Sequence, residues 1–127
     1  MKTIYILVDI SLSIQTEKQK LLHVLNKYID AHRYDYVSIY FFNHEIDSII
    51  VNPSRIKEDD FDFRGRTALW DILNKVIDDA SWDIFPEFII ISDCEDTASS
   101  MCTKESVKFR MECKKCIGWS FKIYNSL

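Results

Sequence analysis

The chain has 127 residues, of which 47% are hydrophobic and 28% charged, and its formal net charge is −4 at pH 7. This length is typical of one domain, the acidic balance disfavours nucleic acid as the main partner, and no stretch approaches the roughly 18 apolar residues of a membrane span. We therefore expect a single soluble domain over residues 1–127, located in the cytoplasm.

The first predicted element is a strand over residues 1–9, in which the apolar run Ile4-Tyr5-Ile6-Leu7-Val8 ends at Asp9. Such a run predicts a strand buried on both faces, as in a parallel sheet, and it is too short for a secretory signal. Ser11 and Ser13 follow, so one carboxylate and two hydroxyls stand where open α/β sheets bind ligands. These hard oxygen donors suit Mg²⁺ or a similar cation.

A helix and a hairpin are predicted next. Residues 16–32 carry apolar side chains at helical spacing, and Thr16 is the expected N-cap. Two strands, 36–42 and 45–51, are separated only by the turn Asn43-His44. Because so short a connection joins antiparallel strands, we expect a mostly parallel sheet with one antiparallel edge strand.

The second half of the chain begins with a polar loop and then alternates helices and strands. Residues 52–66 form an acidic loop that we expect to be a solvated surface, held down by Phe61 and Phe63. A helix is predicted from Thr67, a strand over 88–91, a helix over 104–116 and a final strand over 119–124. The order β-α-β-β-α-β-α-β predicts a three-layer, doubly wound α/β fold.

The four cysteines, Cys94, Cys102, Cys113 and Cys116, are expected to be free thiols, because the chain is not a small loop-rich secreted scaffold. Cys113-Lys-Lys-Cys116 has the spacing of redox motifs and zinc knuckles. It falls in a predicted helix, however, with no second ligand pair nearby, which favours structural or surface thiols.

Polar residues in three separate loops can meet at one edge of this sheet. Asp9 and Asp93 each follow a buried strand, and they flank the topological switch point if those two strands are neighbours. Thr67 begins its helix after a long loop, so its hydroxyl can face the same edge. The three loops offer oxygen ligands only, which predicts a cation site.

Three motifs carry a resemblance to a known family. They are Asp9-Ile-Ser11-Leu-Ser13, Gly65-Arg-Thr67-Ala-Leu69 and Ile91-Ser92-Asp93-Cys94-Glu95-Asp96-Thr97. In their order and spacing they resemble the signature of a von Willebrand factor A domain with a metal-ion-dependent adhesion site. The resemblance covers essentially the whole chain and implies a compact form of that Rossmann-like fold, without its final helix.

The same resemblance implies a ligand set. Ser11, Ser13 and Thr67 would bind the cation directly, whereas Asp9 and Asp93 would act largely through bound water. The cation implied is Mg²⁺, with Mn²⁺ or Ca²⁺ as alternatives.

The function implied is protein recognition rather than catalysis. A cation held by neutral hydroxyls keeps an open coordination position and much of its charge, so it attracts an Asp or Glu of a partner protein. Arg64 and Arg66, just before Thr67, are candidates for steering such a partner, although solvated loop arginines are the commoner interpretation. We expect an intracellular adaptor or inhibitor and no enzyme activity.

Two alternatives remain open. A Mg²⁺-dependent nuclease of the PIN or NYN type would use Asp9, Asp93 and Asp96, but such chemistry needs several carboxylates and the first loop supplies hydroxyls. The other alternative is a structural subunit whose site carries no metal.

The sequence also departs from the family pattern. Leu12 and Cys94 stand where the family often has glycine, and they are expected to stiffen or narrow the mouth of the site. Without a final helix, part of the sheet face near the carboxyl terminus would be under-covered. We expect a second copy of the chain or a partner to bury it.

Overall fold

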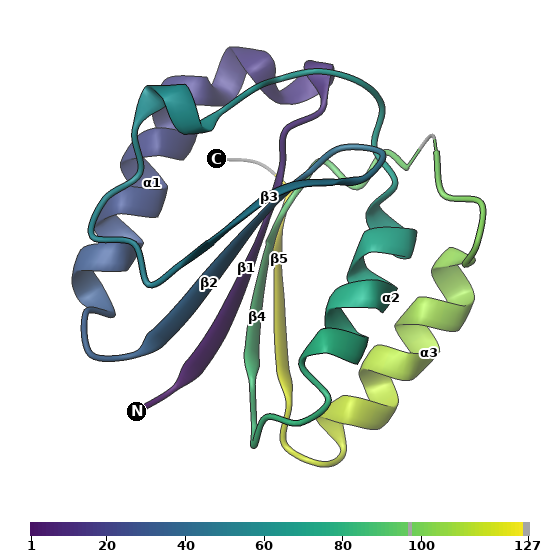
Figure 1. The fold of residues 1–127 in the computed structure, drawn as a ribbon. Helices are drawn as coiled ribbons and strands as arrows, with labels where there is room; N and C mark the ends of the chain where they lie inside the picture. Colours follow the sequence, from purple (N-terminus) through teal and green to yellow (C-terminus); the bar gives the residue numbers. More distant parts are fainter. Residues whose placement is uncertain (97, 126–127) are drawn as a thin grey trace.

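The structure is a computed structural model that describes residues 1–96 and 98–125. A five-stranded sheet in the order β3-β2-β1-β4-β5 forms its middle layer (Figure 1). The strands are β1 (Thr3–Asp9), β2 (Tyr36–Phe42), β3 (Ile46–Val51), β4 (Glu87–Ile91) and β5 (Ser120–Tyr124). β1 pairs in parallel with β2 and β4, β4 pairs in parallel with β5, and β3 is the antiparallel edge strand.

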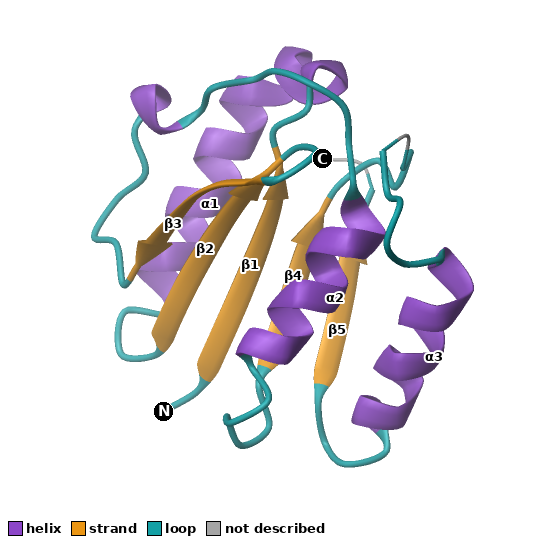
Figure 2. Cartoon of the chain, turned by 45° about the vertical axis from the view of Figure 1, so that its right-hand side comes forward, coloured by secondary structure: helices purple, strands orange, loops and turns teal. Residues whose placement is uncertain are grey.

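Helices cover both faces of this sheet. The helix α1 (Lys18–Ala31) lies on one face, and α2 (Leu69–Asp79) and α3 (Lys104–Lys115) lie on the other (Figure 1; Figure 2). Two short 3₁₀ turns, η1 (Leu12–Glu17) and η2 (Glu58–Asp60), complete the set. The expected three-layer, doubly wound α/β fold with one antiparallel edge strand is confirmed, and no helix follows β5 among the described residues.

The central position of β1 follows from its unbroken apolar run. Tyr5 and Leu7 pack in the core beneath α2 and α3, whereas Ile4, Ile6 and Val8 pack in the core beneath α1. Alternate side chains of a strand point to opposite faces, so only an apolar run fills two cores at once. The strand therefore delivers Asp9 to the carboxyl edge from the middle of the sheet.

The prediction of Thr16 as the helix N-cap was wrong. Thr16 lies inside η1, and α1 begins only at Lys18, after an N-cap residue, Glu17, whose side chain makes no capping bond. The chain leaves β1 through a tight 3₁₀ turn instead, because the main chain of Leu12 is bonded to Gly65 O at 3.2 Å. The contact between Leu12 and the distant loop of Gly65 therefore outweighed the local preference of Thr16 for an N-cap position.

The long loop after β3 crosses from the α1 side to α2 over the carboxyl edge of the sheet (Figure 1). Asn26 of α1 holds it by bonds to Ile56 N at 2.7 Å and Ile56 O at 3.0 Å. Phe61 packs edge-on against Phe41 with ring centroids 5.5 Å apart, and Phe63 stacks on Phe61 at 5.6 Å. The expectation that the two phenylalanines hold the loop down is confirmed.

Neither a membrane span nor a disulfide is found in the described part of the chain. No helix there is long and apolar enough to cross a membrane. The thiols of Cys94 and Cys102 are partly buried, and those of Cys113 and Cys116 are exposed. All four are free, as expected.

Candidate metal centre

The five predicted ligand residues meet at the carboxyl edge of the sheet. Ser11 Oγ lies 3.1 Å from Ser13 Oγ, and Ser13 Oγ donates to Asp93 Oδ2 at 3.2 Å. Thr67 Oγ1 lies 3.4 Å and 3.5 Å from the two carboxylate oxygens of Asp9. A hydrogen bond from Ser11 N to Asp9 Oδ1 joins these two sets of contacts, so all five residues are linked although three separate loops supply them.

Asp9 is the innermost of these groups, with 0% of its surface exposed. Its carboxylate accepts hydrogen bonds from Ser11 N and from Ser92 Oγ, both at 2.8 Å. Burial raises the pKa of Asp9, the hydrogen bonds from Ser11 and Ser92 oppose that shift, and the charge of Asp93 adds to it. Burial thus disfavours the charge of Asp9 unless a proton or a cation neutralises it.

Burial within the group is graded, so the site is open on one side. Ser11 and Thr67 are each 2% exposed, whereas Ser13 is exposed and Asp93 is partly exposed. The donors are three hydroxyls and two carboxylates, all hard oxygens, and this set fits Mg²⁺. Residues 1–96 and 98–125 form no metal-binding group of three or more His, Cys, Asp or Glu.

Thr67 reaches the site because its loop is bonded to two neighbouring loops. Arg64 N donates to Ile10 O at 3.0 Å, and Ala68 N donates to Asn43 O at 2.9 Å. Between them, Gly65 has a φ of +75°, and an added Cβ would lie 3.0 Å from His44 Nδ1. A side chain at Gly65 would be strained and crowded, so this glycine fixes the path that buries Thr67.

The two arginines of this loop differ in their contacts. The guanidinium of Arg64 pairs with Asp47 at 2.8 Å and with Asp62 at 3.4 Å, and these carboxylates raise its pKa. Arg66 is exposed and forms no ion pair with any residue that the structure describes. Of the two predicted steering residues, Arg66 has the more available charge.

The loop that follows Asp93 is held by two carboxylates, those of Asp96 and Asp71. Asp96 accepts from Trp70 N at 3.0 Å and from Ser99 N at 2.8 Å, which places it at the first turn of α2. The expectation that Asp96 bonds the loop rather than a metal agrees with these contacts. Sequence reasoning missed Asp71, which accepts from the main chain of Ser100, Met101 and Cys102. Thr97, the last residue of the third motif, lies outside the described residues.

Replacing Asp96 with alanine is expected to lower the free energy of unfolding by about 1–2 kcal/mol at neutral pH, as for other lost caps. Burial alone would raise the pKa of Asp96, but hydrogen bonds from Ser99, Trp70 and Ala98 outweigh it and lower the pKa. The stabilisation is therefore present above the ordinary aspartate pKa and is lost as the pH falls through the lowered one.

Urea denaturation of wild type and Asp96→Ala, at neutral and at acidic pH, measures this effect. The exposed neighbour Glu95 supplies the control, since Glu95→Ala should change the stability little. A stability difference between wild type and Asp96→Ala that stays the same at both pH values would show that the carboxylate charge is not responsible.

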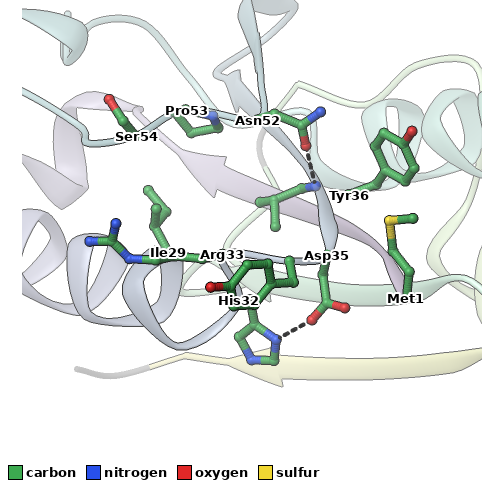
Figure 3. A pocket seen from close by; sticks show the side chains of 11 residues that line it. Met1, Ile29, His32, Arg33, Asp35, Tyr36, Asn52, Pro53 and Ser54 are labelled. Carbon is green, nitrogen blue, oxygen red and sulfur yellow. Dashed lines mark hydrogen bonds and ion pairs between the residues drawn. The ribbon is translucent and has the colours of Figure 1, made fainter.

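A cavity of about 620 Å³ lies at the amino edge of the sheet, away from the candidate metal centre (Figure 3). His32 Nδ1 lies 2.9 Å from Asp35 Oδ2 there, and Val37 N donates to Asn52 Oδ1 at 2.9 Å. Hydrogen bonds from the main chain of Lys2 and from His32 lower the pKa of Asp35. These polar groups bind one another, and none of the predicted site residues lies in this cavity.

Comparison with protein-family models gives no match, and comparison with curated proteins gives none either. Among solved structures, the chain is similar to the conserved hypothetical protein BatB from Bacteroides thetaiotaomicron, with a TM-score of 0.65 and 14% identity. The similarity covers 97% of this chain but 65% of that one, so the chain spans less than two thirds of the BatB structure. At this identity the similarity shows the fold alone. The fold is of the von Willebrand factor A type.

Two residues mark where this chain differs from the glycine pattern associated with the von Willebrand factor A resemblance. Cys94 has a φ of +63°, a left-handed conformation that glycine adopts at lower cost. Its N–H donates to Ser92 Oγ at 3.1 Å, so the loop keeps this turn in spite of the side chain. Leu12 is 59% exposed, and its apolar side chain stands in the loop between Ser11 and Ser13.

An apolar depression begins beside the candidate site. A hollow of about 220 Å³ is lined by Ser13, Ile14, Thr16, Glu17, Ile91, Ser92, Asp93, Tyr124 and Asn125. A second hollow of about 190 Å³ is lined by Ile6, Val24, Leu25, Tyr28, Ile89, Ile91 and Tyr124. Ile91 and Tyr124 belong to both, so the surface continues from the site along the sheet face between α1 and β5. The sheet face near the carboxyl terminus is therefore incompletely covered in the described chain.

Proposed function

We propose that the chain is a divalent-cation-dependent protein-interaction module, in which the cation presents an open coordination position to an Asp or Glu of a partner. The supporting observation is that the hydroxyls of Ser11, Ser13 and Thr67 converge with the carboxylates of Asp9 and Asp93, with one side exposed. Mg²⁺ suits these oxygens, with Mn²⁺ or Ca²⁺ as alternatives.

Some residues of the site would hold the cation, and others stand where the cation would meet a partner. A bound cation would supply a positive charge that neutral hydroxyl ligands leave largely uncompensated, and this charge attracts a carboxylate. Ser11 N and Ser92 Oγ fix the orientation of Asp9 beneath the site. Ser13 and Asp93 stand at its solvent side, where the partner would approach.

The apolar depression offers the partner a second contact. Ile91 and Tyr124 line it next to Asp93, so an apolar residue near the partner's acidic one can occupy it. A second copy of the chain is the alternative occupant. Arg66, exposed at the rim, would attract an acidic partner, in line with its predicted steering role.

The nuclease alternative has less support. It requires Asp96 to help hold a metal together with Asp9 and Asp93. The carboxylate of Asp96 instead accepts hydrogen bonds from Trp70, Ala98 and Ser99. We therefore propose recognition and not hydrolysis as the activity of the site.

We also propose that the module acts in the cytoplasm. Its four cysteine thiols are free, and two of them are exposed. Disulfides are rare in reducing compartments, so free exposed thiols agree with an intracellular protein.

Affinity capture with the full chain tests the proposed function. A partner should be recovered in Mg²⁺, and at least about tenfold less should be recovered in EDTA or with Asp9→Asn, because EDTA removes the cation and the substitution removes a carboxylate that helps to hold it. Asp59→Asn is the matched control, since it makes the same chemical change at an exposed acid of η2.

Two results would contradict this proposal. A partner retained equally in Mg²⁺ and EDTA would show that recognition needs no metal. Mg²⁺-dependent cleavage of single-stranded RNA that Asp93→Asn abolishes would establish the nuclease instead.

A further inference from the structure

A second unusual surface lies at the other end of the molecule. Between α2 and β4, one short loop exposes Trp82, Ile84 and Phe85, whose exposed fractions are 93%, 80% and 66%. The loop stands at the amino edge of the sheet, opposite the candidate metal centre (Figure 2). Large apolar side chains gathered this way at the surface of a soluble domain mark an interaction site.

In this loop the side chain of Asp83 points toward the sheet, whereas those of Trp82 and Ile84 point to solvent. Tyr5 Oη, on the central strand, donates a hydrogen bond to the carboxylate of Asp83. Asp83 N donates to Ala80 O at 3.0 Å, so both the main chain and the side chain of this residue are anchored. Trp82 and Ile84, on either side of Asp83, are thereby held outward on a fixed loop.

Phe85 is held in an unfavourable backbone conformation. Its φ is +51°, a left-handed value that is rare for a bulky residue. Its ring lies over Gly118, where an added Cβ would approach Phe85 Cδ1 to 2.5 Å. Ile117, 59% exposed, adjoins this contact. We call Trp82, Ile84, Phe85 and Ile117 the apolar knob. Strain of this kind persists only where the surrounding structure enforces it, and it concentrates at functional sites.

The charges around the knob favour a partner surface with basic residues. Residues 76–103 contain no Lys, Arg or His. Asp79 and Asp83 form no ion pair with a basic residue in the described part of the chain, whereas Glu87 pairs with Lys2 at 3.5 Å and with Lys122 at 4.0 Å. Of the adjoining lysines, Lys115 pairs with Glu112 at 2.9 Å, and Lys114 keeps its charge over the ring of Trp119 at 4.6 Å. The carboxylates of Asp79 and Asp83 would repel an anionic bilayer, and they would attract Lys or Arg side chains around an apolar pocket of a partner protein.

The shape of the surface disfavours a second copy of the chain. The knob protrudes from the fold and exposes on the order of 500 Å² of side chain, estimated from typical side-chain areas. Two such knobs would also bring Asp79 and Asp83 of both copies together across a two-fold axis.

We propose that the apolar knob is a second protein-docking surface, which inserts into an apolar pocket rimmed by Lys or Arg on a partner protein. The module would then bind at both ends of its sheet, through a cation at the carboxyl edge and through apolar side chains at the amino edge. The second contact depends on neither Asp9 nor a metal, so it is independent of the proposed function.

Site-specific photo-crosslinking in the full chain tests this inference. Benzoylphenylalanine is placed at Ile84, or at Tyr34 as a control, because Tyr34 is 91% exposed and belongs to another surface. The crosslinked protein is then identified, purified and titrated against the wild-type chain and the double variant Trp82→Ser/Ile84→Ser. We expect affinity to fall at least tenfold in the variant and also with rising salt, but to be unchanged by EDTA.

Unchanged thermal unfolding of the double variant would confirm that any loss of binding is local, as expected for exposed side chains. The proposal is overturned if position 84 captures no protein beyond those captured at position 34. It is also overturned if the knob residues instead mediate sedimentation with phosphatidylserine vesicles, or a concentration-dependent dimer in analytical ultracentrifugation.

Discussion

Replacing Asp9 with asparagine is expected to weaken Mg²⁺ binding by roughly 10- to 100-fold, as for other residues that orient a metal site. The metal-free variant should be at least as stable as wild type. Asp9 is fully buried, and its carboxylate bears the cost of that burial when no cation is present. Asparagine has nearly the same shape and can still accept the bond from Ser11 N.

The pH dependence of stability gives this prediction a second readout. Because burial raises the pKa of Asp9 in the folded state, protonation stabilises the metal-free protein. This contribution is fully present below the unfolded aspartate pKa and is lost as the pH rises through the raised one. Asp9→Asn should abolish this decrease of stability with rising pH. Mg²⁺ should make the decrease smaller, in wild type only.

Titration calorimetry with Mg²⁺ and thermal unfolding in EDTA measure the two effects. Asp59→Asn again serves as the control at an exposed acid. An Asp9→Asn variant that binds Mg²⁺ as wild type does would remove Asp9 from the site. A variant that unfolds in EDTA would assign Asp9 to the stability of the fold instead.

Replacing Phe88 with alanine is expected to lower the free energy of unfolding by about 3–5 kcal/mol, the usual cost of emptying a large aromatic site. Phe88 is 0% exposed on β4. Its ring stacks with Tyr5 at 5.2 Å, with Trp119 at 5.6 Å and with Phe121 at 4.8 Å. The substitution would remove the ring that joins the central strand to the edge strand β5.

Urea denaturation gives the size of this loss. Phe109→Ala, at a position 72% exposed on α3, should change the stability by less than about 0.5 kcal/mol. A loss below about 1 kcal/mol for Phe88→Ala would mean that the aromatic stack closes over the cavity.

The sheet and its site edge could be predicted because the signals for them are local. The run from Ile4 to Val8 could be satisfied only by burial on both faces, and the short turn after Phe42 allowed only a hairpin. Asp9 and Asp93 end neighbouring parallel strands, and such ends lie at one edge whatever the details of packing.

Other features escaped prediction because distant segments decide them. Asp71 has the sequence pattern of a solvated helix residue, yet its carboxylate binds the main chain of residues 100–102. Thr16 looked like a cap, but the contact of Leu12 with Gly65 set the turn instead. The knob could not be found from residues 82–85 alone, since the inward anchoring of Asp83 depends on Tyr5.

The sequence by itself determined the succession of helices and strands along the chain, the two-sided burial of β1 and the kinds of oxygen donor at the site. Hydrophobic periodicity and turn length are properties of neighbouring residues, so the sequence alone contains them. The tertiary structure alone decided that Ser13 lies 3.2 Å from Asp93, 80 residues away, and that the site keeps one open side. Distances of this kind depend on how whole loops pack, and no local pattern encodes them.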